Sequence, residues 1–137
     1  MAMWLFTKAI LDGKPIKVFN NGNMRRDFTY VDDIVTGVLA TVDNPPIDPG
    51  AENGVPHKVY NIGNNNPEEL MTMIGTIESA LGIVAEKEFL PLQPGDVPET
   101  SADISLINKD HGFEPTTKID VGIPRFIDWY KTYHNIA

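Results

Sequence analysis

The sequence predicts a layered α/β or α+β protein, because segments with helical periodicity alternate with short segments that have the pattern of strands. The predicted order is helix, strand, a second short extended segment, helix, strand, helix, strand and two helices. The chain has 137 residues, of which 42% are hydrophobic, so it is long enough to bury one sizeable core as a single domain.

The composition excludes several kinds of partner. The 19 acidic residues outnumber the 11 basic ones, and a net charge of −8 opposes nonspecific binding to nucleic acid or to an anionic membrane. There is no cysteine, which rules out disulfides and thiolate chemistry and is typical of the cytoplasm. No apolar run approaches the roughly 20 residues that span a bilayer, and Lys8 and Asp12 interrupt the apolar start of the chain. We therefore expect a soluble, cytoplasmic protein.

The first elements precede the most densely charged stretch. A helix is predicted over residues 3–11 and ends at Gly13. No capping residue precedes Trp4, so we expect a chain that starts inside a helix and is a fragment of a longer protein. Residues 14–19 alternate as in a half-exposed strand, and the Asn-Asn-Gly-Asn sequence at 20–23 predicts a hairpin or a tight loop.

Residues 24–35 combine two arginines, a short extended segment and an acidic helix start. Arg25 and Arg26 either face an anionic ligand or form the solvated rim of a turn. A helix is predicted from Val31, with one apolar face made of Ile34, Val35, Val38, Leu39 and Val42. Asp32 and Asp33 fall in its first turn, where each favours the helix dipole by roughly 0.3 to 1 kcal/mol. The dipole explains these carboxylates without a metal ion.

The middle of the chain contains clear signals for a loop, a strand and a helix. Residues 43–56 are rich in Pro, Gly, Asn and Asp and are predicted to be a surface loop, and residues 57–62 form a short predicted strand. Asn66-Pro67-Glu68-Glu69 predicts a helix start capped by Asn66. Gly82 ends that helix, whose buried stripe is predicted to be Leu70, Ile74, Ile77 and Leu81.

The last third contains a strand, a loop and two helices. Residues 85–90 are predicted to form the strand, and the three prolines of residues 91–98 predict a stiff loop. Residues 103–109 predict a short helix. Residues 117–120 resemble a capping box for the final helix. Four residues of that helix are predicted to lie in the core: Phe126, Ile127, Trp129 and Tyr130.

Several catalytic patterns are missing from the chain. There is no Gly-rich phosphate loop of the dinucleotide or P-loop kind, and there is no nucleophile elbow. His57, His111 and His134 are too far apart in sequence to form a metal-binding pair. The residues therefore predict binding chemistry without a complete catalytic apparatus.

Several motifs together resemble one enzyme family. The run from Arg26 to Ile34, preceded by Gly13-Lys14-Pro15-Ile16 and followed by Val59-Tyr60-Asn61-Ile62-Gly63, resembles the carboxyl-terminal part of extended short-chain dehydrogenase/reductases that act on nucleotide sugars. Gln93-Pro94-Gly95-Asp96-Val97-Pro98 and the Gly112-Phe113-Glu114-Pro115 sequence are similar to those of UDP-glucuronate 4-epimerases.

The resemblance implies an α/β fold for residues 1–137: a substrate-binding lobe with a small mixed sheet and packed helices, without the Rossmann core. In such enzymes the other half holds NAD and supplies a catalytic Tyr-x-x-x-Lys pair. No tyrosine in this chain has a lysine four positions later. The resemblance thus implies no catalytic residue, bound cofactor or metal ion in this chain, and NAD in the longer parent enzyme.

The resemblance also implies substrate-binding residues. Arg26 matches a position that contacts the nucleotide diphosphate, although an ion pair with Asp27 or a neighbouring acid is the structural alternative. Asp96 matches a carboxylate that accepts hydrogen bonds from nucleotide hydroxyls, and the alternative is that it caps a turn. Gln93 stands where relatives often have a phosphate-binding arginine, so a neutral donor replaces a cation. Arg25 is expected to be a rim residue.

The strand at residues 14–19 matches the one that lies against the uracil. Ile16 and Lys17 would contribute through backbone groups and Phe19 through its ring, with core packing as the alternative for Phe19. Two functions follow. The chain is either the UDP-sugar-binding lobe of an NAD-dependent epimerase, inactive alone and weak in UDP binding, or a free-standing, non-catalytic binding domain. We expect exposed apolar surface to drive self-association through Trp4, Phe6 and the strands near Phe19 and Ile62.

Overall fold

The computed structural model describes residues 2–47 and 57–136, and these divide into two compact units. Unit 1 comprises Met1–Arg26, Pro67–Thr100 and Lys118–Ala137, and unit 2 comprises Asp27–Asn66 and Ser101–Thr117. Each unit therefore joins segments that are distant in sequence. That residues 1–137 form one domain stays a prediction.

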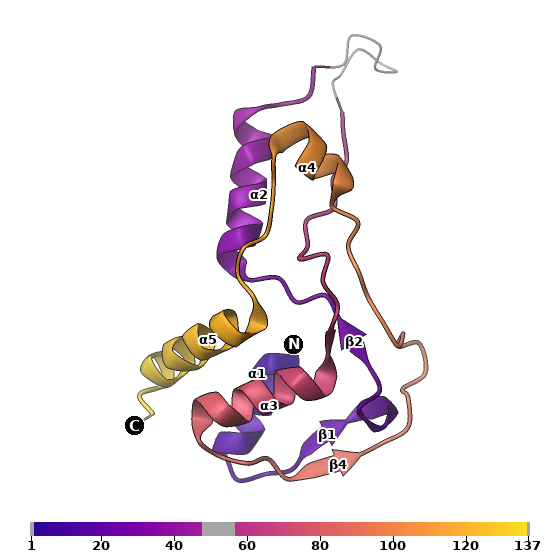
Figure 1. The fold of residues 1–137 in the computed structure, drawn as a ribbon. Coiled ribbons are helices and arrows are strands. Elements are labelled where there is room, and N and C mark those ends of the chain that lie inside the picture. The colour runs from indigo at the N-terminus through magenta and orange to yellow at the C-terminus, as the bar shows by residue number, and fades with distance from the viewer. Residues whose placement is uncertain (1, 48–56, 137) are drawn as a thin grey trace. The chain divides into compact units, whose positions relative to one another are not determined.

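Unit 1 contains most of the regular elements (Figure 1): α1 (Ala2–Leu11), β1 (Ile16–Val18), a 3-10 turn (Phe19–Gly22), β2 (Arg25–Arg26), β3 (Glu68–Glu69), α3 (Leu70–Leu81), β4 (Lys87–Phe89) and α5 (Ile119–His134). Its core lies where α3 packs against α5, with α1 and β1 beside them. The predicted buried stripe of α3 is confirmed, since Ile74 and Ile77 are fully buried and Leu70 and Leu81 are nearly so.

The strands of unit 1 form two small sheets, and neither is a hairpin between neighbouring strands. β1 pairs with β4 in parallel, and β2 pairs with β3 in antiparallel orientation. Between β1 and β2 the chain makes a 3-10 turn in which Asn20 and Asn21 adopt φ of 50°. The predicted tight loop is confirmed. The alternative of a hairpin is wrong, because the turn leads into a strand that pairs elsewhere.

One predicted helix start and two predicted caps are wrong, because long-range contacts replace the local capping signal at Asn66 and at Thr117. The third helix begins at Leu70 instead of Pro67, because Glu68 and Glu69 are extended and pair with β2. The Leu70 N–H donates to the Met24 carbonyl at 2.8 Å, so Asn66 is not its cap. The last helix begins at Ile119, and no side chain caps its start. The predicted end of α3 is confirmed, since Gly82 has φ of 69°.

Unit 2 contains α2 (Val31–Asp43) and α4 (Ser105–His111) around a small apolar cluster. The cluster consists of the buried residues Ile104, Ile107 and Phe113, with Tyr60, Ile62 and Ala102 packed against it. Gly37 lets α2 approach it closely, since a Cβ there would lie 3.1 Å from Ile62. The strand predicted over residues 57–62 does not form, because no described segment pairs with it.

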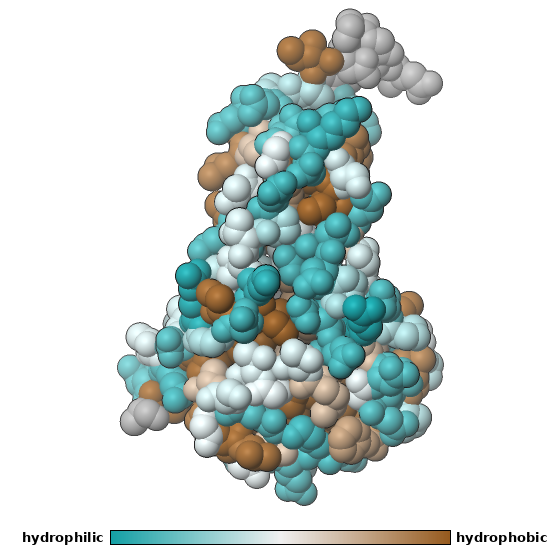
Figure 2. Space-filling view, viewed as in Figure 1, coloured by the Kyte–Doolittle hydropathy of each residue, from teal (hydrophilic) through white to brown (hydrophobic). Residues whose placement is uncertain are grey.

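The apolar face predicted for α2 is largely exposed. The residues of α2 that are buried are Asp33 and Gly37, and the exposed ones include Val31, Val35, Val38, Leu39 and Val42. Figure 2 shows hydrophobic residues at the margin of the region drawn over this helix. The helical period is therefore predicted correctly, but the face that is buried is not. We call these five residues the α2 apolar face; it includes Val31 and omits Ile34, a half-buried residue of the predicted face.

Other burial predictions for aromatic residues are mixed. Phe6 is buried, at 9% exposure, so it does not contribute to an exposed apolar surface. Tyr130 is buried as predicted, whereas Trp129 is 50% exposed and stacks on Tyr133 at 5.3 Å. The predicted loop at 43–56 extends over residues 48–56, which lie outside the described part of the chain. Among the described residues, no helix is both long and apolar enough to cross a membrane.

Candidate functional site

The loop at residues 91–98 is attached at both ends to the connection between β1 and β2. At its start, the Leu90 N–H donates to the Val18 carbonyl at 2.9 Å, and the Asn21 N–H donates to the Leu90 carbonyl at 3.0 Å. At its end, the Arg25 N–H donates to the Pro98 carbonyl at 2.8 Å. These bonds place the loop beside β2, within unit 1.

A tight turn orients Asp96 within this loop. The Asp96 N–H donates to the Gln93 carbonyl at 3.1 Å, and Gly95 has φ of 84°. Proline at the second position and glycine with positive φ at the third are the features of a type II turn. The Asp96 carboxylate also accepts a 2.9 Å hydrogen bond from the Val97 N–H. The turn therefore fixes the Asp96 side chain before any ligand arrives.

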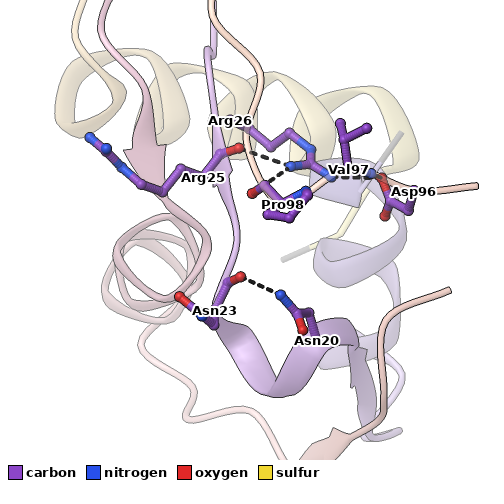
Figure 3. Close-up of polar contacts among 7 residues, drawn as sticks. All are labelled: Asn20, Asn23, Arg25, Arg26, Asp96, Val97 and Pro98. Atoms are coloured by element: carbon purple, nitrogen blue, oxygen red, sulfur yellow. Dashed lines mark hydrogen bonds and ion pairs between the residues drawn. The ribbon is translucent and has the colours of Figure 1, made fainter.

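Arg26 reaches this turn from β2 (Figure 3). Its Nη2 donates to Asp96 Oδ1 at 2.8 Å, and its Nη1 donates to the carbonyls of Arg25 at 2.9 Å and Pro98 at 3.2 Å. The side chain is 24% exposed, so the ion pair is partly shielded from water. The structure thus brings together two predicted site residues that lie 70 positions apart. The ion-pair partner of Arg26 is Asp96.

Asp27, the alternative partner for Arg26, instead binds backbone groups in unit 2. Its carboxylate accepts N–H bonds from Asn64 and Asn65, both at 3.1 Å, and from Ala102 at 2.9 Å. Gly63 allows this close approach, since a Cβ there would lie 2.3 Å from the Cβ of Ala102. Asp27 therefore holds two loops together.

Asp33 has a similar role in unit 2. Its buried carboxylate accepts bonds from the Thr116 N–H and hydroxyl, both at 3.2 Å, and from the Thr117 N–H at 3.0 Å. Burial by itself favours the protonated acid, but the donors at Thr116 and Thr117 outweigh it and lower the pKa of Asp33. The helix dipole alone does not explain this aspartate. No group of three or more potential metal ligands occurs among the described residues.

The remaining predicted residues lie in unit 1 with different exposures. Ile16 is buried, and its N–H donates to the Glu86 carbonyl at 2.8 Å, so its side chain belongs to the core. Lys17 and Gln93 are exposed, and Phe19 is half-buried. Because the loop starts beside Val18 and Asn21, these residues lie on segments adjacent to the pair formed by Arg26 and Asp96.

Arg25, predicted to be a rim residue, makes more contacts than that prediction implies. Its Nη2 donates to the Pro67 carbonyl at 2.8 Å, and its Nη1 pairs with Glu99 Oε2 at 3.1 Å. Successive side chains of a strand point to opposite sides, so Arg25 extends away from the side that Arg26 occupies (Figure 3). This alternation along a strand was the signal in the sequence that Arg25 and Arg26 point to opposite sides. Nothing in the sequence identified Glu99 as its partner.

The six predicted substrate-binding residues, which we call the wall, lie outside two cavities that the structure describes. A cavity of about 550 Å³ in unit 2 is lined by residues that include Tyr60 and Asp110, and one of about 580 Å³ in unit 1 is lined by residues that include Thr76 and Asp120. None of the six predicted substrate-binding residues lines either cavity.

The strand exit and the helix start nearest to Arg25 and Arg26 in sequence lack the features of a dinucleotide site. A dinucleotide site needs a Gly-rich turn that leads from a strand into a helix N-terminus. Here β1 leads into a turn built by Asn20 and Asn21, and the first turn of α2 carries Asp32 and Asp33. Acidic side chains at that helix start would repel a pyrophosphate.

Sequence comparisons identify the relatives of this chain. Residues 2–63 match the NAD dependent epimerase/dehydratase family. Protein CapI of Staphylococcus aureus is 46% identical over 144 residues, which cover 98% of this chain and 43% of CapI. The chain is a relative of the NAD-dependent epimerases and dehydratases. A probable UDP-glucuronate 4-epimerase of Rhizobium meliloti is 38% identical over 143 residues, which cover 95% of this chain and 41% of that protein.

Solved structures of the NAD-dependent epimerases share the fold. The UDP-glucuronic acid 4-epimerase of Bacillus cereus, in complex with UDP-glucuronic acid and NAD, superposes with a TM-score of 0.82 at 30% identity. The match covers 97% of this chain and 40% of that enzyme. This epimerase relative therefore has the predicted α/β fold and spans about two fifths of the length of the curated relatives it matches.

Proposed function

We propose that this chain is the UDP-sugar-binding part of an NAD-dependent epimerase that inverts C4 of UDP-glucuronate by transient oxidation. The observation that carries the proposal is the partly buried Arg26 guanidinium, held beside Asp96 on a loop that a type II turn preorganises. The names of the relatives, which include UDP-glucuronate 4-epimerases, favour the same substrate class. The whole of residues 1–137 would form the substrate-binding part.

Each residue of the wall has a role in this proposal. Arg26 binds the diphosphate, because its planar fork can donate two parallel hydrogen bonds to phosphate oxygens. Asp96 accepts hydrogen bonds from nucleotide hydroxyls, and Gln93 contributes a neutral donor. The backbone of Lys17 and the ring of Phe19 face the uracil. The Ile16 N–H already donates to the Glu86 carbonyl, so Ile16 would contribute through its carbonyl.

The proposal gives this chain no catalytic step. The chain has no Tyr-x-x-x-Lys pair, and the strand exit and the helix start nearest to Arg25 and Arg26 lack the features of a dinucleotide site, so the cofactor and the catalytic base would belong to the rest of the enzyme. Alone, the chain should bind a UDP-sugar weakly and should not epimerise it. A nucleotide-sugar substrate also agrees with a cytoplasmic location.

A second candidate function is a free-standing binding or interaction domain that has lost catalysis. The α2 apolar face favours it, because a helix side with five exposed hydrophobic residues is suited to covering by a partner. This function would not require Arg26 to face a ligand.

Titration with UDP, followed by calorimetry and by the amide spectrum of the chain, separates the two. We expect binding in the millimolar range at best, because one wall makes only part of the contacts of a full pocket. Arg26→Lys should weaken it further by about tenfold, since lysine cannot make a bidentate phosphate contact. Arg125→Lys, the same change on α5, is the matched control.

Three results would contradict the proposal. UDP binding that Arg26→Lys leaves unchanged would remove Arg26 from the site. NAD retained through purification would mean that the chain holds a cofactor site of its own. Saturation by UDP at micromolar concentration would favour an independent binding module over part of an enzyme.

A further inference from the structure

Arg25 connects three segments of unit 1 that are far apart in the sequence. Its guanidinium bonds the Pro67 carbonyl ahead of β3 and the Glu99 carboxylate behind the Asp96 turn, at 2.8 and 3.1 Å. Its backbone N–H donates to the Pro98 carbonyl, and its own carbonyl accepts a 3.2 Å bond from the Thr100 N–H. Arg25 thus holds the end of the loop at residues 91–98 both through its side chain and through its backbone.

Arg25 and Arg26 act on the same loop from opposite sides of β2 (Figure 3). Arg26 meets the loop at Asp96 and Pro98, whereas Arg25 meets it through Glu99. A parallel bridge between Arg25 and Glu99 continues this contact along the backbone. The position of Asp96 relative to Arg26 therefore depends on the attachment at Glu99, three residues later.

We propose that Arg25 is a positioning residue: together with Glu99, it holds the loop at the register in which Arg26 and Asp96 can engage a UDP-sugar. The inference rests on the function proposed above for the wall. That proposal assigns no role to Arg25. The inference gives Arg25 no contact with the ligand. Loss of the side chain would loosen the loop exit, with the two backbone bonds of Arg25 still in place.

A purely electrostatic role for Arg25 predicts a different outcome. Arg25→Ala removes a positive charge near an anion site and should weaken UDP binding in either case. Glu99→Ala removes a negative charge, so electrostatics alone predicts tighter binding, whereas loss of positioning predicts weaker binding. The double variant removes both charges together. Electrostatics predicts that it restores the affinity for UDP, and positioning predicts that it does not.

The test combines UDP titration with hydrogen exchange at the Val97 and Thr100 amides of the whole chain. We expect Arg25→Ala and Glu99→Ala each to weaken UDP binding and to accelerate exchange at both amides by about three- to tenfold, the range for a partly exposed polar contact. The double variant should be no worse than Arg25→Ala, because both changes break one attachment. Lys8→Ala, which breaks the exposed pair with Asp12, should change neither readout.

Three results would overturn the proposal or its basis. Tighter UDP binding by Glu99→Ala, or restored binding by the double variant, would reduce Arg25 to a local charge. Unchanged exchange at Val97 and Thr100 in Arg25→Ala would show that the backbone bonds hold the loop alone. If wild-type chain binds no UDP while exchange accelerates as expected, the proposed function fails and the attachment of the loop by Arg25 stands.

Discussion

Each of the two units is stabilised internally by a different kind of interaction. Unit 1 has an apolar core in which side chains of α3, α5 and β1 are fully buried, among them Ile16, Ile74 and Ile123. The described part of unit 2 has the small cluster around Ile107, together with buried or half-buried carboxylates that accept backbone N–H groups. Burial of apolar area dominates the first unit, and charge-assisted hydrogen bonds dominate the second.

The difference follows from where the backbone N–H groups of each unit find their hydrogen-bond acceptors. In unit 1, helices and paired strands provide the partners of most N–H groups. In unit 2, the segments at 57–66 and 101–104 have no strand pairing among the described residues, so carboxylates replace the missing carbonyls. Unit 2 should therefore be sensitive to loss of single charges, and unit 1 to loss of apolar volume. Four substitutions test this contrast, from the largest expected effect to the smallest.

The largest effect is expected from Ile74→Ala in unit 1. Ile74 is fully buried on α3, and shortening it leaves a cavity, so the free energy of unfolding should fall by about 3 kcal/mol. Both tryptophans, Trp4 and Trp129, belong to unit 1, so their fluorescence during urea denaturation reports this loss.

Val35→Ala on α2 is the matched control for Ile74→Ala. Val35 is 48% exposed, and the same kind of truncation there should change the free energy of unfolding by less than about 0.5 kcal/mol. Equal losses for the two variants would mean that α2 is buried in solution and that the contrast between the units is wrong.

The sequence predicted the helices of both units better than it predicted which segments pair with each other. Helical periodicity placed α1, α2 and α3, and glycine placed the end of α3. The start of α3 was wrong, because the local pattern at Asn66 competes with the pairing of Glu69 and Arg25, which are 44 positions apart. A capping signal is local, whereas strand pairing depends on contacts that a single sequence does not reveal.

The second largest effect is expected from Asp27→Ala in unit 2. The change leaves the N–H groups of Asn64, Asn65 and Ala102 without their acceptor, and each loss of a charge-assisted bond is costly. We expect a loss of about 2 kcal/mol in the free energy of unfolding. Hydrogen exchange at the Ala102 amide measures it within unit 2.

Asp32→Ala is the control for this prediction. Asp32 is exposed in the first turn of α2, so its loss removes only a favourable dipole contact of about 0.5 kcal/mol. If Asp27→Ala shifted the tryptophan transition of unit 1 as much as exchange at Ala102, the units would unfold together and the contrast would not extend to stability.

The candidate site shows the same limit of sequence reasoning. The resemblance selected Arg26 and Asp96 separately, and the structure pairs them. The turn chemistry of Pro94 and Gly95 was visible in the sequence, and so was the stiffness of the loop. The contacts of Arg25 were not, because its partners Pro67 and Glu99 belong to segments that only the fold brings to β2.

A smaller effect is expected for unit 2 in acid. Hydrogen bonds from Thr116 and Thr117 overcome the effect of burial and lower the pKa of Asp33, so the ionised form stabilises the folded state. This stabilisation is complete above the ordinary aspartate pKa of about 4 and is lost as the pH falls through the lower folded value. Asp33→Asn should destabilise unit 2 by about 1 to 2 kcal/mol at neutral pH.

The pH dependence separates this effect from simple loss of packing. Between neutral pH and about pH 3, Asp33→Asn should lose less stability than the wild-type chain, because the variant has no carboxylate to protonate at that position. Exchange at the Thr117 amide, followed at several pH values, measures the difference. An identical acid dependence in the two proteins would show that Asp33 does not contribute through its charge.

The smallest effect on stability, with a clear effect on association, is expected from Val42→Ser on α2. Val42 is 67% exposed, so its replacement should leave the free energy of unfolding nearly unchanged. We predict that the chain self-associates through the α2 apolar face and that this change reduces the association in sedimentation velocity. Val84→Ser, at a hydrophobic residue of unit 1 that is 83% exposed and outside that face, is the matched control. Equal association of the two variants would mean that exposure alone, and not the contiguous face of α2, governs contact between copies.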